Sequence, residues 1–242
     1  MTHPVRIGSP RCYAVGPMES VGILIKFFAL AFGALLPVIN PLGSALLFLS
    51  LIDDAPATVV RTLSRKIAIN TVFFLLVIQL VGTAMLAFFG ISLPVMQVAG
   101  GLVLAAMGWK LLNQEDSARP RNIDQAHKPS ADLGQFTSKL FYPFTFPITA
   151  GPGTIVVLLT LSAHASARGL LPDALSHLGI FMAVIAVCVL VYISYIYARE
   201  ITSRVAPQTA QGILRVIAFV LLCIGVQITW NGLQAMLKTV LR

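Results

Sequence analysis

Five long stretches of the chain contain no Asp, Glu, Lys or Arg, and this absence of charge constrains the fold more than any other feature. A helix needs about 20 apolar residues to cross the hydrocarbon core of a bilayer. A soluble domain carries roughly 25% charged residues, whereas this chain carries 11% and is 57% hydrophobic. The uncharged stretches are residues 27–51, 67–109, 140–167, 174–198 and 216–237. The sequence therefore predicts an all-α polytopic membrane protein.

Six membrane spans account for these stretches, because a Gly/Pro turn at residues 90–94 divides the second stretch in two. Within the third span, Gly101, Ala105 and Gly108 share one helical face, which predicts close packing against a neighbouring helix. The expected spans are residues 20–51, 67–90, 93–112, 138–162, 174–198 and 209–237.

The remaining segments define the domain organisation. The tail over residues 1–17 is rich in Pro and Gly and lacks the apolar core of a signal peptide, so Met18 is an alternative start. The composition of the only long polar segment, residues 113–135, predicts a linker. We therefore divide the chain into a disordered tail (1–17), a first transmembrane repeat (18–112), the linker (113–135) and a second transmembrane repeat (136–242).

The basic charge of the chain predicts its orientation. Of the 17 Lys and Arg residues, six fall on the side that holds both termini and eleven fall on the side that holds the linker. Cytoplasmic loops carry the excess of Lys and Arg. We therefore expect a multi-pass protein of the bacterial inner membrane with both termini outward and a cytoplasmic linker. On this interpretation the net charge of +8 reflects topology rather than nucleic-acid binding.

The two halves of the chain share a pattern of helix breakers. Residues 38–44 (VINPLGS) and residues 150–154 (AGPGT) each interrupt an apolar run and end in a hydroxyl residue. Each proposed repeat has three spans, an odd number, so two consecutive copies must insert in opposite orientations. Inverted repeats with breakers in corresponding spans are typical of secondary transporters.

The breakers predict that the first and fourth helices are discontinuous. Proline has no backbone N–H, so Pro41 and Pro152 each leave a carbonyl without its helical partner. Asn40 precedes a proline and is disfavoured in the α region. Three glycines can take left-handed conformations; these are Gly43, Gly151 and Gly153. The exposed helix ends must then face protein, water or a ligand. The alternative is that these residues only kink packed helices.

Two broken helices can bind a zwitterion without a buried ionisable residue, because helix N-termini favour carboxylates and C-termini favour ammonium groups. We expect hydroxyl contacts from Ser44 and Thr154, and amide contacts from Asn40, Gln227 and Asn231. The alternative role for each polar side chain is a helix–helix hydrogen bond. The predicted substrate-binding residues are Asn40, Pro41, Gly43, Ser44, Gly151, Pro152, Gly153, Thr154, Gln227 and Asn231.

At these residues the chain resembles the MarC family of bacterial inner-membrane proteins. The resemblance covers nearly the whole chain from Met18 onward, apart from the linker. It implies a six-span, two-repeat fold with discontinuous first and fourth helices and a substrate site where the breaks meet. The family includes transporters of small neutral amino acids. The matching motifs are residues 36–42 (LPVINPL), 100–101 (GG), 150–155 (AGPGTI), 225–227 (GVQ) and 231–232 (NG).

The leading functional hypothesis is therefore a carrier of small neutral amino acids or similar small polar solutes that works by alternating access. The alternatives are a passive channel, a non-transporting membrane scaffold and, less favoured, an intramembrane enzyme. No H-E-x-x-H, G-x-S-x-G or G-x-x-x-x-G-K-[ST] motif supports an enzyme or an ATP-driven pump.

We expect no cofactor, no metal and no nucleic-acid partner. His164 and His177 flank the predicted loop between the fourth and fifth spans, where loop histidines without a metal are the simpler interpretation. The partners expected are a small-molecule substrate, the lipid bilayer and a coupling ion, either H⁺ or Na⁺. No carboxylate lies in the middle of a span, so backbone carbonyls and hydroxyl groups would have to hold such an ion.

Overall fold

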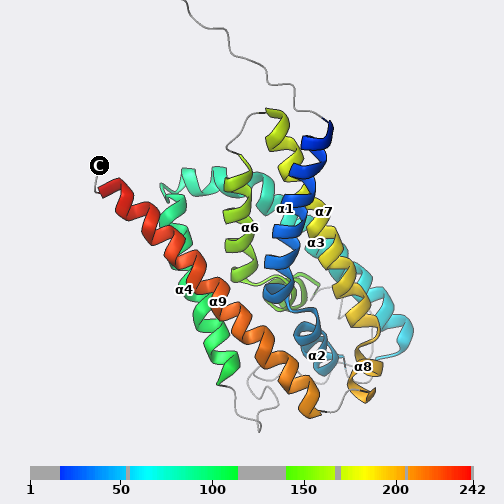
Figure 1. Cartoon of the computed structure of the whole chain (residues 1–242). Helices are drawn as coiled ribbons and strands as arrows, with labels where there is room; N and C mark the ends of the chain where they lie inside the picture. The colour runs from blue at the N-terminus through cyan, green and yellow to red at the C-terminus, as the bar shows by residue number, and fades with distance from the viewer. Residues whose placement is uncertain (1–16, 53–54, 114–139, 167–169, 205–206, 241–242) are drawn as a thin grey trace, which may run out of the picture.

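The computed structural model describes residues 17–52, 55–113, 140–166, 170–204 and 207–240, and every regular element within these ranges is a helix (Figure 1). The predicted tail and linker lie outside the described residues, except for Pro17 and Asn113. In chain order the helices are α1 (Pro17–Ile39), α2 (Pro41–Leu51), α3 (Ala57–Phe88), α4 (Leu93–Leu112), η1 (Leu140–Thr149), α6 (Pro152–Ala165), α7 (Leu170–Ile196), α8 (Ala198–Arg204) and α9 (Pro207–Val240).

The described helices provide five or six candidate membrane spans. Helices α1 and α2 together form one span, Met18–Leu49, and α3, α4, α7 and α9 supply four more. Helices η1 and α6 form a sixth span if they are counted together, although they bend by 68° at their junction. These spans confirm the predicted all-helical polytopic membrane protein. The inverted repeat stays a prediction.

The second span begins earlier than the sequence predicts. We expected it to begin at residue 67, but α3 begins at Ala57 and runs for 32 residues. Arg61 and Arg65 lie in its first turns and are exposed. Long basic side chains can reach an aqueous surface from the end of a helix. The loss of charge along the sequence therefore marks the apolar part of this helix and not its first residue.

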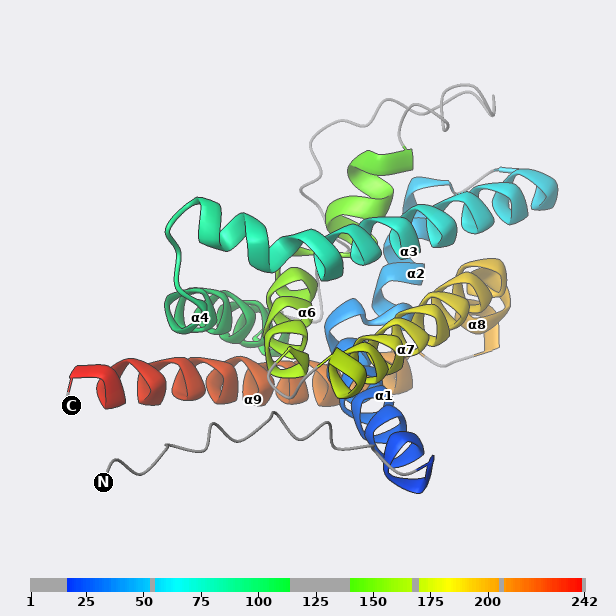
Figure 2. The ribbon, with the colours of Figure 1, turned by 90° about the horizontal axis from the view of Figure 1, so that it is seen from above.

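Figures 1 and 2 show how the helices are arranged. Helices α4 and α9 form an antiparallel pair on one side of the bundle, and α1 lies beside α7 on the other. Helix α6 lies between the two pairs, and α3 crosses behind them to reach the start of α4. Helix α1 begins and α9 ends toward the same end of the bundle, as the predicted topology requires. Which end faces the cytoplasm stays a prediction.

Glycines allow α4 and α9 to approach until their backbones touch. A Cβ added to Gly101 would lie 2.6 Å from the Thr229 nitrogen and 2.7 Å from the Gly225 oxygen. A Cβ added to Gly108 would lie 2.6 Å from a backbone nitrogen of α9. The predicted close-packing face of Gly101, Ala105 and Gly108 is therefore confirmed. Such packing stabilises helix pairs in lipid, where the hydrophobic effect gives no preference for association.

A single left-handed residue separates α1 from α2. Asn40 has φ 46° and ψ 71°, and Pro41 begins α2. The Gly43 N–H donates to the Asn40 Oδ1 over 3.1 Å, so the Asn40 side chain caps the new helix. A Cβ on Gly43 would come within 2.9 Å of the Asn40 Cγ. Gly43 therefore leaves room for the capping side chain.

None of the three glycines expected to be able to take left-handed conformations does so, and Gly153 lies inside α6. Gly43 lies inside α2, and Gly151 has the extended values φ −81° and ψ 178°. Among the described residues the positive-φ positions are Asn40 and Gly90. Asn tolerates the left-handed region because its short amide can hydrogen-bond locally, which is what the Asn40 side chain does. Gly90, with φ 67°, forms the predicted turn between α3 and α4.

The backbone around the second break is irregular over more residues than at the first break. Tyr142 and Phe146 have extended backbone angles within η1, and each precedes a proline. Threonine hydroxyls satisfy carbonyls that the irregular winding leaves open. The Thr145 hydroxyl donates to the Leu140 oxygen over 2.8 Å, and the Thr149 hydroxyl donates to the Phe144 oxygen over 2.7 Å. The prolines of the fourth span thus accompany a bend of 68° between η1 and α6.

The α4–α9 contact predicts a large cost for a side chain at Gly101. Gly101→Leu must push the α9 backbone away, and overpacking costs about 1–3 kcal/mol. Thermal unfolding of purified protein in detergent should show a clearly lower midpoint for this variant. Gly22→Leu in α1 is the matched control, because a Cβ at Gly22 meets nothing within 4 Å. Equal midpoints for the two variants would refute the close contact.

The geometry of Asn40 predicts an order of stability for three side chains. Asn40→Ala loses a cap, at about 0.5–2 kcal/mol, and holds alanine left-handed, at about 1–2 kcal/mol. Asn40→Gly loses the capping side chain but carries no left-handed penalty. We expect unfolding midpoints in the order wild type, Asn40→Gly, Asn40→Ala. An alanine variant as stable as the glycine variant would show that residue 40 is not left-handed.

Candidate functional site

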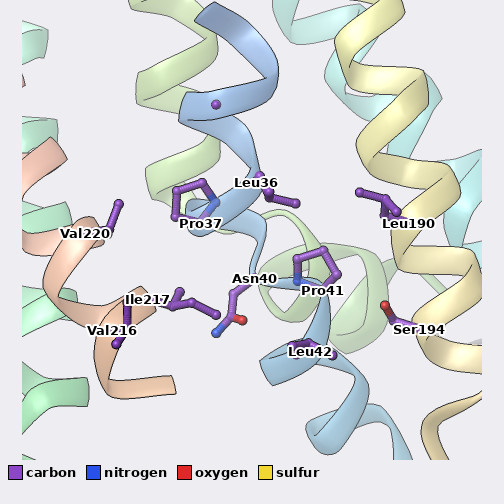
Figure 3. Close-up of a pocket in the computed structure, with 11 residues that line it drawn as sticks. Leu36, Pro37, Asn40, Pro41, Leu42, Leu190, Ser194, Val216, Ile217 and Val220 are labelled. Atoms are coloured by element: carbon purple, nitrogen blue, oxygen red, sulfur yellow. The ribbon is translucent and has the colours of Figure 1, made fainter. Parts of the chain in front are cut away.

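A cavity of about 420 Å³ lies at the break between α1 and α2 (Figure 3). Its volume is within the usual range for small-molecule sites. Helices α7 and α9 form the walls on either side of the break. The lining residues are Gly33, Leu36, Pro37, Asn40, Pro41 and Leu42 from the break, Leu190 and Ser194 from α7, and Val216, Ile217 and Val220 from α9.

Asn40 and Ser194 supply the polar side chains of this cavity, and the other lining residues are apolar. The Asn40 Oδ1 accepts from the Gly43 N–H, while the Asn40 Nδ2 has no hydrogen-bond partner among the described residues. Figure 3 shows the Asn40 side chain extending toward Ile217. The cavity is therefore almost wholly apolar, with the Asn40 amide and the Ser194 hydroxyl as its polar side-chain groups. This combination suits a small ligand that has a polar head.

The two predicted residues that follow in α2 have structural partners. Ser44 is buried, and its hydroxyl hydrogen-bonds the Asn40 oxygen at 3.0 Å and the Pro41 oxygen at 3.2 Å. Gly43 donates to the Asn40 side chain. Neither residue lines the cavity. Of the four predicted residues at the first break, Asn40 and Pro41 therefore meet the cavity directly, and Gly43 and Ser44 hold the break in shape.

The four predicted residues of the second break begin α6 and do not line the cavity. These residues are Gly151, Pro152, Gly153 and Thr154. A Cβ on Gly153 would lie 3.3 Å from the Val38 Cγ1, so the second break packs against the last turn of α1. From this contact α2 and α6 run in opposite directions (Figure 1). The structure therefore brings the two breaks together, with the cavity on the α1–α2 side alone.

The N-terminus of α6 has an unsatisfied polar group beside it. Gly151 offers no side-chain cap, and Thr154 is fully buried. The Thr154 hydroxyl has no hydrogen-bond partner among the described residues. A buried hydroxyl without a partner costs about 1–3 kcal/mol. The N-terminus of α6 therefore has one buried polar group that nothing in the described residues satisfies.

Gln227 and Asn231 lie on α9 beyond the cavity. Both are exposed, and the Gln227 Nε2 donates to the Asn231 Oδ1 over 2.9 Å. Neither residue lines the cavity. These two residues are therefore separate from the site at Asn40 and pair with one another on the α9 surface.

Sequence reasoning missed the α7 side of the site. Ser194 lines the cavity, and its neighbour Tyr195 is fully buried beneath the break. The Tyr195 hydroxyl lies 2.8 Å from the Thr149 Oγ1, and its ring stacks on Phe48 with 4.4 Å between centroids. Tyr195 thus ties α7 both to α2 and to the end of η1. The polar residues inside the apolar run 192–197 (YISYIY) were the available signal.

The two histidines have local partners. The His164 Nδ1 lies 2.7 Å from the Thr160 oxygen. His177 accepts a bond from Gln79 at its backbone oxygen over 2.8 Å, and its Nε2 lies 3.0 Å from the Ser166 Oγ. Within the described ranges no three His, Cys, Asp or Glu residues are grouped as metal ligands would be. His177 therefore joins α3, α6 and α7.

Comparison with known proteins identifies the relatives of the chain. It is 28% identical to the UPF0056 inner membrane protein MarC of Salmonella arizonae, over 89% of this chain and 98% of that protein. It is 29% identical to the protein of the same name in Citrobacter koseri, with the same coverage. It is 27% identical to the UPF0056 membrane protein YvbG of Bacillus subtilis, over 88% of this chain and 97% of that protein.

No solved structure matches the chain significantly. The family-level match covers most of the sequence, since residues 25–237 match the family described as MarC family integral membrane protein. The matched range includes the cavity at Asn40 and both helix breaks. The apolar spans and the inner-membrane relatives also agree on a multi-pass inner-membrane protein. The chain belongs to the MarC family.

Proposed function

We propose that this protein is a secondary carrier of small neutral amino acids, or of similar small polar solutes, in the inner membrane. The observation that carries the proposal is the cavity at the Asn40 break, within the span Met18–Leu49. A helix break in the middle of a span is costly in lipid unless its polar groups meet a partner. Transporter folds place substrate at such discontinuous helices.

The ends of α1 and α2 complement the two charges of an amino acid. The N-terminus of α2 carries partial positive charge and attracts a carboxylate. The end of α1 carries partial negative charge, and Pro41 supplies no N–H to the Pro37 carbonyl. An ammonium group is attracted to such carbonyls. The apolar wall formed by Leu36, Leu190 and Val220 suits a small aliphatic side chain.

Alternating access requires two elements that move against each other, and the proposed inverted repeat supplies them. The contact between Val38 and Gly153 joins the two breaks, and α2 and α6 diverge from it in opposite directions. We propose that the unsatisfied Thr154 hydroxyl contacts the solute or a coupling ion in another state of the cycle. H⁺ and Na⁺ are the proposed coupling ions, and oxygen atoms of the backbone and hydroxyl groups would hold Na⁺.

Transport by purified protein in proteoliposomes tests the proposal. Wild-type protein should take up radiolabelled alanine or serine saturably, and unlabelled amino acid inside the vesicles should accelerate the uptake by exchange. Flux that does not saturate would favour a channel. A folded protein that moves no small neutral amino acid would exclude the proposed substrate class.

A cavity-filling variant localises the transport site. Gly33 lines the cavity, and a Cβ there meets nothing within 4 Å, so Gly33→Leu fills space without a clash. We expect about tenfold weaker transport, equivalent to about 1.4 kcal/mol of solute binding. Gly212→Leu on α9 is the control, because a Cβ there also meets nothing within 4 Å and Gly212 does not line the cavity, so transport should be unchanged. Equal rates for the two variants would place the site elsewhere.

A further inference from the structure

Helix α9 exposes two faces of opposite chemistry beyond the cavity. One exposed face is apolar and carries Phe219, Val226, Trp230, Leu233 and Leu237. The other exposed face, which we call the polar face, carries Gln227, Asn231, Gln234 and Lys238. Positions within each face recur at intervals of three, four or seven residues, which is the repeat of a helix surface. The third face of α9, with Gly225, packs on α4.

The polar face is the continuation of the α9 wall of the cavity. Val220 lines the cavity, and Gln227, Asn231 and Gln234 follow it at seven, eleven and fourteen residues. These intervals keep side chains on one side of a helix. A line from the cavity along α9 therefore passes from apolar side chains to three amides and ends at Lys238.

Acyl chains cannot cover this face without cost. Gln227 lies near the middle of the candidate span Gln211–Thr239. Its bond to Asn231 satisfies one donor and one acceptor. The Gln227 Oε1 and the Asn231 Nδ2 have no partner among the described residues. Polar side chains inside a membrane face a protein interior or a water-filled space.

The part of the cavity lining that α1 supplies also continues toward this end of the bundle. Gly33 lines the cavity on α1, and Ala29 and Lys26 precede it at helical spacing and are exposed. Helices α1 and α9 diverge from the cavity toward the end of the bundle at which α1 begins and α9 ends (Figures 1 and 2). Both faces are therefore open along their length.

We propose that the polar face of α9 and the Lys26–Gly33 face of α1 line a water-filled route between the cavity and that side of the membrane. The inference rests on the proposed function in one respect, because the route serves a solute only if the cavity binds it. The polar face presents amides and Lys238 and no carboxylate. The route therefore suits neutral or zwitterionic solutes and disfavours cations.

Cysteine accessibility tests the route without relying on transport. In a background that lacks Cys12, Cys188 and Cys223, single cysteines are introduced as Asn231→Cys and Gln234→Cys. The matched controls on the apolar face are Val226→Cys and Leu233→Cys. Sealed vesicles of known orientation are treated with a membrane-impermeant anionic methanethiosulfonate, and total thiol is measured after denaturation to correct for folded yield.

We expect Asn231→Cys and Gln234→Cys to react about tenfold faster than the controls, because only a hydrated thiol forms the reactive thiolate. The reaction should occur from the side that exposes the C-terminus. Equal, slow reaction at all four positions would overturn the route. Rapid oxidative cross-linking of Asn231→Cys between two copies, with no labelling, would also overturn it and assign the face to an oligomer contact.

The two proposals fail separately in this design. Labelling of the polar face without amino-acid transport would support a hydrated route and remove the proposed substrate class. Saturable transport with an unlabelled polar face would keep the carrier and exclude this route.

Discussion

The hydrocarbon core of a bilayer offers no hydrogen-bonding partner to a main-chain N–H or C=O group, and the structure depends on how the chain meets this constraint at Asn40. A continuous helix would satisfy every such group internally. Pro41 removes one donor, and the left-handed Asn40 ends α1 and starts α2. Asn40 and Pro41, the residues at this interruption, line a cavity. Each functional inference derives from that placement.

The two breaks meet the constraint differently, and the difference suggests a division of roles. At the first break the Asn40 side chain caps α2 and the Ser44 hydroxyl donates to the Asn40 and Pro41 oxygens, so the local geometry is stabilised without a ligand. At the second break no side chain caps α6, and the buried Thr154 hydroxyl is left without a partner among the described residues. The first break thus lies beside a cavity, and the second leaves one buried hydroxyl unsatisfied among the described residues.

Local chemistry predicted where the breaks occur, because Pro and Gly act on their own segment of chain. Asn40 and Gly151 are the N-cap residues of α2 and α6, and the discontinuous transmembrane helices stay a prediction. The sequence pointed to glycines as residues that can be left-handed, whereas Asn40 takes that conformation, with its side chain bonded to the Gly43 N–H three residues on. The Ser194 wall could not be predicted, because no breaker marks that span and pairing of spans is a tertiary property. Gln227 was expected in the site for its polarity, but it lies seven residues further along α9 than the cavity-lining Val220 and does not line the cavity.

Amide hydrogen exchange of the protein in lipid nanodiscs tests the central claim most directly, because water can exchange an amide only where it reaches one. The decisive comparison is between a peptide over residues 40–46 and a peptide from the middle of α7. A solvent-facing break predicts exchange about a hundredfold faster for the Leu42 amide, which has no hydrogen-bond partner among the described residues, than for amides in α7. Equal protection in the two peptides would mean that the first span is sealed at Asn40, and it would contradict a binding site there.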